Sequence, residues 1–85
     1  NDIIIEGHTD TIPVRGGPYR SNWELSIARA VGVGNFFTAS GLDPKQLVAA
    51  GYGEFHPAYP NDSEVNRARN RRIEITLVRQ ARSTL

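Results

Sequence analysis

Apolar residues recur along this chain in two different spacings, and segments rich in glycine and proline separate them. The β-branched run at residues 3–5 is typical of a strand that is buried on both faces, and Glu6 and Gly7 are expected to end it. Residues 47–52 predict a second strand, because a short apolar run is bounded there by glycines.

Over residues 73–77, isoleucine and leucine alternate with glutamate and threonine. This period of two predicts a third strand with one buried face. Residues 80–85 show no pattern, so we expect one folded domain over residues 1–79 and a flexible tail over residues 80–85.

A long helix is predicted between the first two strands. Ser21 and Glu24 fit a capping box, in which the serine hydroxyl accepts from the backbone of the third helical residue. Gly41 suits the residue that ends a helix in a Schellman motif. Helical steps place most apolar residues of this segment in one sector of about 140°, and Arg29 lies inside that sector, where an arginine either reaches an edge or meets an anion. Three aromatic residues are expected in the core: Trp23, Phe36 and Phe37.

Two shorter helical segments follow. Asp43 and Pro44 predict a single turn through Gln46. Asn61 and Glu64 form a second pair of cap and third helical residue, which predicts a helix over about residues 62–70. The order strand, helix, strand, short helix, strand defines a thin α/β layer, which one further strand and helix upstream of the chain start would cover better.

Composition narrows the class of protein. The chain has 85 residues, enough for one domain, and its hydrophobic content of 39% is too high for a disordered segment. A net charge of +1 gives no overall attraction to nucleic acid or lipid. The chain has no cysteine, no signal-peptide pattern and no apolar run near the roughly 20 residues of a membrane span. Because it has no methionine and opens almost directly on a strand, we expect a fragment of a longer protein.

The stretch from Gly7 to Arg29 concentrates the candidate chemistry. Asp10 follows the first strand, and Arg29 lies two turns into the long helix. The loop between strand and helix is longer than the usual connection of about 2–6 residues, which favours a surface role. Two interpretations are open on this pattern alone: the two residues form a salt bridge that closes the corner, or they frame a charged cleft for a zwitterionic ligand.

Other chemistries have weaker support. A metal site would need His8, His56 and Asp10, but two histidines without ligand spacing are usually structural, so we expect neither a metal nor a cofactor. No spacing of nucleophile, base and orienting group is visible, so we expect no catalytic residues and no enzyme. The arginines at residues 67–72, with Trp23 as one stacking aromatic among several, leave nucleic-acid binding as a distant alternative to a solvated helix face.

Several segments taken together resemble the OmpA-like domain, which binds peptidoglycan without covalent attachment. They are Gly-His-Thr-Asp at 7–10, Asn22 with Leu-Ser-x-x-Arg-Ala at 25–30, Gly-Tyr-Gly at 51–53, Asn61, and Asn-Arg-Arg-Ile-Glu-Ile at 70–75. The resemblance covers nearly the whole chain, to about Val78. Ser-Asn-Trp-Glu-Leu-Ser at 21–26 is most similar to the MotB-type branch, the flagellar stator subunits that grip the cell wall. The resemblance implies an OmpA-like βαβ two-layer sandwich, a mixed sheet with helices packed on it, without the family's first strand and helix.

The resemblance also implies a ligand and its contacts. In the family, the aspartate of the first motif and the arginine of the second hold the diaminopimelate of the peptidoglycan stem peptide, which implies Asp10 and Arg29 here. Further contacts are implied at Asn22, Arg71 and Thr11. Diaminopimelate offers an ammonium and a carboxylate on one carbon, so Asp10 can accept from the ammonium and Arg29 can grip the carboxylate bidentately.

The function implied is a non-catalytic wall anchor. We expect a periplasmic domain of an inner-membrane protein, a flagellar stator subunit with a membrane-spanning segment elsewhere in the parent protein. The alternative is an outer-membrane or lipoprotein anchor unrelated to flagella. A wall hydrolase would need a nucleophile or a carboxylate pair at hydrolytic spacing, and the sequence shows neither. A homodimer is expected, because a thin layer leaves apolar surface to cover.

Overall fold

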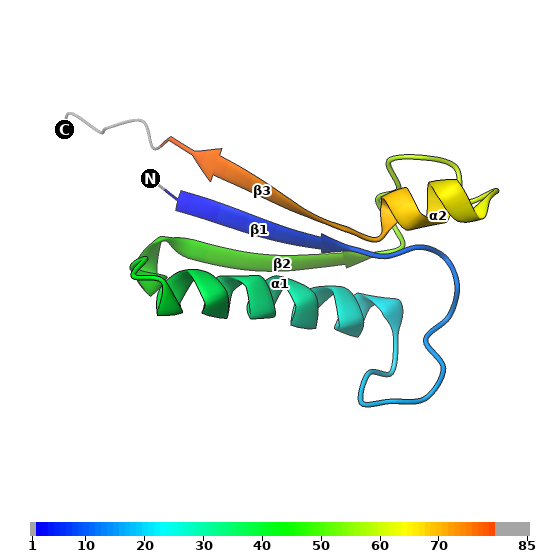
Figure 1. The fold of residues 1–85 in the computed structure, drawn as a ribbon, viewed down its shortest axis with the longest axis horizontal. Coiled ribbons are helices and arrows are strands. Elements are labelled where there is room, and N and C mark those ends of the chain that lie inside the picture. The colour runs from blue at the N-terminus through cyan, green and yellow to red at the C-terminus, as the bar shows by residue number, and fades with distance from the viewer. Residues whose placement is uncertain (1, 80–85) are drawn as a thin grey trace.

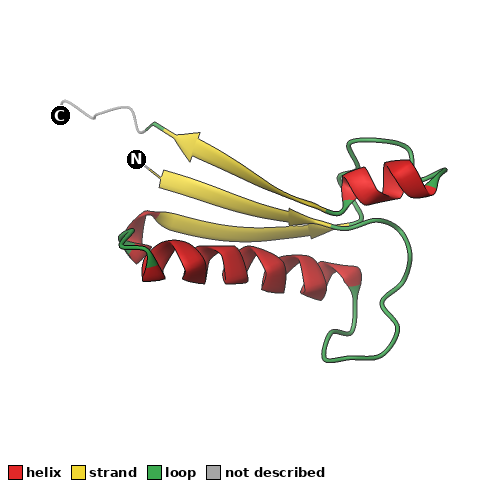
Figure 2. Ribbon diagram, viewed as in Figure 1, coloured by secondary structure: helices red, strands yellow, loops and turns green. Residues whose placement is uncertain are grey.

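In the computed structural model, which describes residues 2–79, three strands form one mixed sheet (Figure 1). The strands β1 (Asp2–His8), β2 (Leu47–Gly53) and β3 (Arg72–Val78) lie in the order β2-β1-β3, with β1 parallel to β2 and antiparallel to β3. Helix α1 (Asn22–Ala39) covers one face, and α2 (Glu64–Asn70) lies beyond the end of the sheet at which β3 begins (Figure 2). The predicted α/β class is confirmed; the predicted tail lies outside the described residues.

The central strand β1 is longer than predicted. The expectation that Glu6 and Gly7 end it is wrong, because Glu6 pairs with both Ala50 and Glu74 and the pairing continues to His8. A central strand satisfies its backbone groups on both edges, so the ladder persists beyond the apolar run that the sequence shows. This extension carries the chain to the far end of the sheet before it turns.

The starts of α1 and of a short 3₁₀ turn follow the predicted local signals. Ser21 Oγ accepts from the backbone nitrogen of Glu24 at 3.1 Å, which satisfies one free amide of the first turn of α1. In η1 (Pro44–Gln46), Asp43 Oδ1 accepts from the backbone nitrogen of Lys45 at 2.9 Å. Both signals lie within a few residues of the element that they begin.

The end of α1 is the predicted Schellman motif. Gly41 adopts φ = 107°, a left-handed conformation that favours glycine. The backbone nitrogens of Gly41 and Leu42 donate to the carbonyls of Thr38 and Phe37, both at 3.1 Å. The chain therefore leaves the helix sharply and returns to β2.

Two strand glycines allow α1 to lie very close to the sheet. A Cβ on Gly7 would collide with the backbone oxygen of Ser26, and a Cβ on Gly51 would lie 2.6 Å from the backbone nitrogen of Ile27. Among residues 2–79, the fully buried apolar side chains are Ile5 and Ala30. This contact fixes the first turns of α1 against the end of the sheet where β1 stops.

The face of β3 that was predicted to be buried is largely exposed. Ile75 and Leu77 lie opposite Ile5 and Ile3, so they share the face that α1 covers on β1. Nevertheless, 51% of Ile75 and 73% of Leu77 are exposed. The prediction is wrong here because α1 packs on β1 and β2 and does not extend under β3 (Figure 1).

The prediction that three aromatic residues of α1 lie in the core is wrong for two of them. Trp23 and Phe36 are both exposed, so the prediction is wrong for them, whereas Phe37 is half-buried. Trp23 lies along the surface and donates from Nε1 to the backbone oxygen of Gly51 at 2.9 Å. A single helix on a three-stranded sheet leaves no second layer to enclose these rings.

Helix α2 begins slightly later than predicted. Its cap is Ser63, whose Oγ accepts from the backbone nitrogen of Asn66 at 3.1 Å, and the prediction of Asn61 is wrong. Asn61 Oδ1 accepts instead from Asn70 Nδ2 at 2.9 Å, so its side chain serves the preceding loop. Neither helix of residues 2–79 combines the length and apolar character that crossing a bilayer requires.

Candidate functional site

Asp10 lies where the chain leaves the sheet, and it is 6% exposed. Its Oδ1 accepts from the backbone nitrogen of Ile12 at 3.0 Å, a local turn that aspartate favours. Thr9 Oγ1 donates to the backbone oxygen of Asp10 at 2.9 Å, and Thr9 N donates to Gly53 O at 2.9 Å. These contacts fix the direction of the carboxylate and leave Oδ2 for a partner from elsewhere in the chain.

Asn22, the first residue of α1, ties the Asp10 turn to the helix. It is buried, and its Nδ2 donates to the backbone oxygens of Asp10 at 3.2 Å and Ile12 at 3.0 Å. The structure therefore gives Asn22 a role in holding the turn. Its contact with a ligand stays a prediction.

Arg71 is the ion-pair partner of Asp10. Its Nη1 lies 2.5 Å from Asp10 Oδ2, and its Nη2 lies 2.7 Å from Glu64 Oε1. The side chain of Arg71 is 34% exposed, so solvent screens this pair only in part. The hydrogen bonds that Arg71 donates to Glu64 and Asp10 raise the pKa of Arg71 above its usual value. Two of the five predicted contact residues, Asp10 and Arg71, are thus joined directly although they are 61 positions apart.

Arg29 is not the partner of Asp10 in this structure. It is exposed, and none of the ion pairs within residues 2–79 involves it. The simple corner salt bridge between Asp10 and Arg29 is therefore not formed.

The helical position of Arg29 nevertheless relates it to Asp10. On the α1 wheel, Trp23 and Ile27 lie on the flank that contacts β2. With about 100° per residue, Asn22 and Arg29 lie together on the opposite flank, roughly 10 Å apart along the axis. Arg29 therefore emerges on the flank of α1 whose first residue, Asn22, bonds the Asp10 turn.

Thr11 and the loop after it are open to solvent. Thr11 is exposed, and residues 11–20 are exposed apart from the half-buried Val14. Gly16 and Gly17 have φ of 68° and 78°, which lets the loop turn away from the sheet as Figure 1 shows. The loop begins directly after Asp10, and a contact of Thr11 with a ligand stays a prediction.

The sequence assigned Glu64 only to the start of a helix, as the partner of the Asn61 cap, and gave Asn70 no role of its own in the site. Glu64 precedes Arg71 by seven positions, about two helical turns, and this spacing was a usable signal. Asn70 is fully buried: its Oδ1 accepts from the backbone nitrogens of Ala58 and Tyr59 at 3.0 and 3.1 Å, and its Nδ2 donates to Tyr59 O at 2.9 Å. Asn70 thereby fixes the loop before α2 and the backbone that carries Arg71.

His8 points to the face of the sheet opposite α1. Its ring stacks on Tyr52, with centroids 5.2 Å apart, and lies 6.5 Å from the ring of His56. Within residues 2–79, no three histidine, aspartate or glutamate side chains are arranged as metal ligands.

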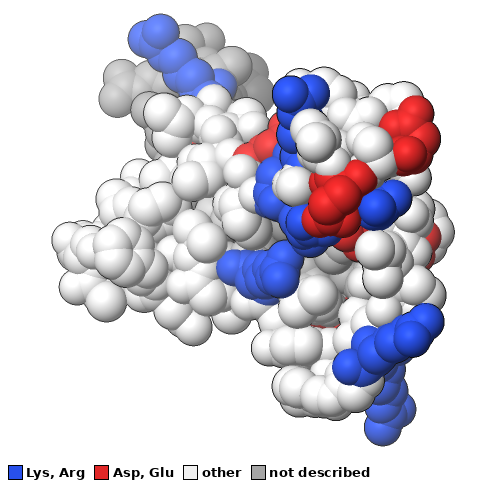
Figure 3. Space-filling view, turned by 45° about the vertical axis from the view of Figure 1, so that its right-hand side comes forward, with Lys and Arg blue, Asp and Glu red and all other residues white. Residues whose placement is uncertain are grey.

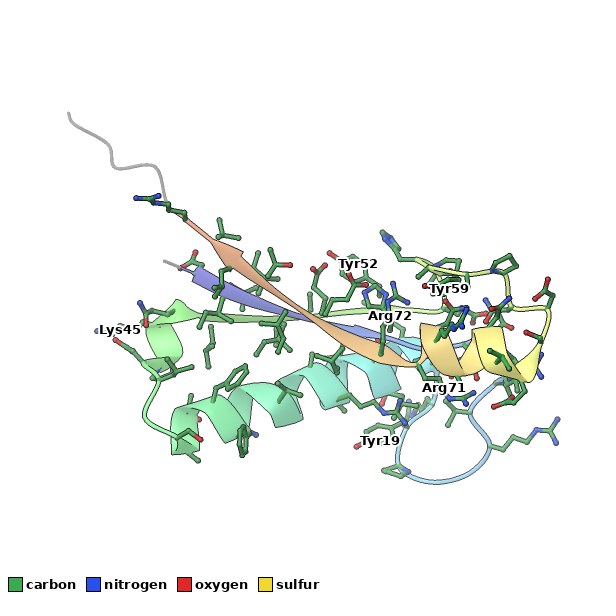
Figure 4. All side chains as sticks on the ribbon, turned by 45° about the horizontal axis from the view of Figure 1, so that its top comes forward. Tyr19, Lys45, Tyr52, Tyr59, Arg71 and Arg72 are labelled. Carbon is green, nitrogen blue, oxygen red and sulfur yellow. The ribbon has the colours of Figure 1, made fainter. Side chains whose placement is uncertain are left out.

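Charged side chains gather at the α2 end of the molecule. In Figure 3, arginines and carboxylates interleave over this end, whereas the opposite end of the same face is largely uncharged. Figure 4 shows that the neighbours Arg71 and Arg72 point to opposite sides, Arg72 toward the side of Tyr52 and Arg71 toward the loop that carries Tyr19. The arginine-rich segment is therefore divided between two faces, and several of its members are paired with carboxylates.

Comparisons with known proteins agree with this architecture. Residues 1–71 match the model of the OmpA family. Motility protein B of Bacillus subtilis is 41% identical over 78 residues, which are 91% of this chain and 30% of that protein. The C-terminal domain of Helicobacter pylori MotB superposes with a TM-score of 0.88 at 36% identity, covering 94% of this chain and 61% of that one. The cell wall anchor of the T6SS from Pseudomonas aeruginosa gives a TM-score of 0.82 at 39% identity, covering 87% of this chain and 52% of that one.

The fold, the motifs and these matches define the class: the chain belongs to the OmpA family. Within that family it is similar to motility proteins of the MotB type. The chain spans less than a third of the length of the Bacillus relative and between half and two thirds of the solved structures.

Proposed function

We propose that this chain is a non-catalytic module that binds peptidoglycan through the diaminopimelate of its stem peptide. The observation that carries the proposal is the environment of Asp10. This residue is only 6% exposed, and its hydrogen bond with the backbone of Ile12 fixes the direction of the carboxylate. Arg71 pairs with the carboxylate, and Arg29 lies on the flank of α1 that begins beside the Asp10 turn. A carboxylate and a guanidinium at one end of the sheet match the two ionic groups of an amino acid.

The ammonium of diaminopimelate is assigned to Asp10. Oδ1 is committed to Ile12, so Oδ2 is the oxygen that accepts from the ligand, in competition with Arg71. The hydrogen bond from Ile12 keeps the carboxylate in place during this exchange, which limits the conformational entropy lost on binding.

The carboxylate of diaminopimelate is assigned to Arg29. An exposed arginine without an ion pair in residues 2–79 is available for a bidentate contact, which the planar guanidinium makes and a lysine does not. Asn22 and Thr11, beside the Asp10 turn, are assigned further contacts, and Arg71 adds positive charge at the same corner.

The anchoring role follows from tethering. Single-site affinity for one stem peptide is modest, but several copies that engage one polymer raise the effective concentration of each site. The similarity to MotB-type proteins favours a periplasmic domain of an inner-membrane stator subunit, which holds the stator against torque. An outer-membrane or lipoprotein anchor with the same ligand is the second candidate, and the sequence of the whole parent protein distinguishes the two.

Sedimentation with purified sacculi tests the proposed site. We expect Asp10→Asn and Arg29→Ala to abolish retention of the chain on sacculi that contain diaminopimelate. The side-chain oxygen of Asn at position 10 keeps the acceptor for Ile12, but its Nδ2 then faces Arg71 Nη1 and cannot accept from it. Because Arg71 stays paired with Glu64, we expect the free energy of unfolding to fall by about 1–3 kcal/mol. The exposure of Arg29 means that its removal strands no buried charge.

Two controls sharpen this experiment. Arg79→Ala removes an exposed arginine just after β3, at the end away from α2, and should keep wild-type retention. Sacculi with lysine in the stem lack the carboxylate assigned to Arg29, so they should retain the wild type poorly. Retention of Asp10→Asn or Arg29→Ala at the wild-type level refutes the proposed site, and release of soluble wall fragments by the wild type would indicate a hydrolase.

A further inference from the structure

Arg71 is held by two carboxylates at once, one on each terminal nitrogen. Nη1 donates to Asp10 and Nη2 donates to Glu64 at 2.7 Å. The second oxygen of Glu64 accepts from Arg67 Nε at 3.3 Å. Asp10, Arg71, Glu64 and Arg67 thus form a chain of alternating charge that runs from the Asp10 turn to α2.

The chain of charges presents a difficulty for a cationic ligand. Oδ2 of Asp10 is already occupied by Arg71, and an ammonium that approaches it meets a guanidinium of like charge. If Arg71 moved into solvent, the ion pair between Arg71 and Asp10 would be lost when the ion pair between the ligand ammonium and Asp10 formed. Glu64 removes this difficulty, because it offers Arg71 a second carboxylate within reach of the same side chain.

We propose that Glu64 is a positioning residue for ammonium recognition: it retains Arg71 while the ligand ammonium takes over Oδ2 of Asp10. This inference rests on the proposed function and adds to it a residue that touches no ligand. Asp10, Arg71, Glu64 and Arg67 sum to zero charge, so when the ammonium pairs with Asp10, Arg71 keeps a carboxylate partner only because Glu64 holds it.

The surroundings of Glu64 suit this role. Arg67, on the same helix, keeps the carboxylate directed along α2 toward Arg71. The hydrogen bond and the charge of Arg71 lower the pKa of Glu64 below its usual value, so it stays ionised near neutral pH. Glu64 is more exposed than Asp10, so Arg71 can shift toward it without entering the interior.

A double-mutant cycle on the 85-residue chain tests the inference. The probe is a soluble stem tetrapeptide with diaminopimelate at its third position, and the measurement is its Kd by titration. We expect Glu64→Gln to weaken binding about three- to tenfold, the range of a partly screened ion pair. In the Arg71→Gln background, the same substitution should change the Kd by less than about twofold, because the residue through which it acts is gone.

A second probe separates positioning from loss of structure. A tetrapeptide with 2-aminopimelate at the third position keeps the carboxylate and lacks the side-chain ammonium, so Glu64→Gln should leave its weak binding unchanged. Glu74→Gln is the matched control, because Glu74 also pairs with an arginine at 2.7 Å but lies on the other face of the sheet. The Kd of the Glu74→Gln variant for the diaminopimelate peptide should equal that of the wild type.

The outcomes keep the two proposals apart. If Asp10→Asn binds the diaminopimelate peptide as the wild type does, the proposed function fails. If Asp10→Asn loses binding and Glu64→Gln binds as tightly as the wild type, only the positioning role fails. The role also fails if Glu64→Gln weakens binding equally in the Arg71→Gln background or toward the 2-aminopimelate peptide.

Discussion

His8 places an imidazole in the interior beside several charges. It is 4% exposed, and neither ring nitrogen has a hydrogen-bond partner within residues 2–79. Nε2 lies 3.3 Å from Glu74 Oε2 but outside hydrogen-bond geometry. Burial, followed by the charge of Arg72, lowers the pKa of His8 from its usual 6.5, against the opposing effects of Glu74 and Glu6. The neutral ring is therefore the form that the fold favours.

This lowered pKa predicts a pH dependence of stability with a definite sign. The unfolded chain binds a proton at His8 near pH 6.5, whereas the folded chain binds it only at lower pH. The contribution of His8 to the free energy of unfolding is therefore fully present above pH 6.5, and it is lost as the pH falls through the lowered pKa of His8 in the folded chain. We expect urea unfolding of His8→Gln to depend less on pH between 7 and 5 than unfolding of the wild type.

The quantity to compare is the slope of the free energy of unfolding against pH, and not the free energy itself, because a buried glutamine changes packing at every pH. Parallel pH profiles for His8→Gln and the wild type would contradict the prediction.

At the scale of elements, three signals that act over a few residues were read correctly from the sequence, whereas the cap of α2 was placed two residues too early. The cap at Ser21, the Schellman end at Gly41 and the turn at Pro44 each depend on neighbours within four positions. We expect Ser21→Ala to destabilise the chain by about 1 kcal/mol, because it leaves the Glu24 amide without its acceptor.

Chemical denaturation of Ser21→Ala, with Ser40→Ala as a matched control at the other end of α1, measures this cost. Ser40 contributes only its backbone nitrogen to the helix end, so its hydroxyl is dispensable. Equal stability of the two variants would show that the capping bond contributes nothing measurable.

Features that depend on tertiary context were predicted less well. The spacing of Ile75 and Leu77 indicates a strand but cannot show that α1 stops short of β3. In the candidate site, too, the residues were predicted better than the contacts between them. Asp10 and Arg71 were identified through motifs, but their ion pair joins residues from opposite ends of the chain, and the sequence paired Asp10 with Arg29 instead. Glu64 reaches the site only because Arg71, between α2 and β3, pairs with both Glu64 and Asp10.

At the scale of the whole molecule, the described fold is a thin layer with an uncovered flank. Ile75 and Leu77 on β3 and Phe36 on α1 are exposed apolar side chains. Apolar surface of this kind, next to a strand at the edge of a sheet, favours association.

We therefore predict that the 85-residue chain forms a homodimer through this flank at concentrations of tens of micromolar. Leu77→Lys places a charge in the middle of the apolar surface and should shift the chain to the monomer in sedimentation velocity or light scattering. Thr76→Lys is the matched control, because Thr76 is exposed on the same strand but points to the opposite face. A monomeric mass of 9.4 kDa for the wild type across this range would contradict the prediction. Loss of the dimer in both variants would instead locate the contact at the edge of β3, since either lysine would then disturb strand pairing and not the apolar face alone.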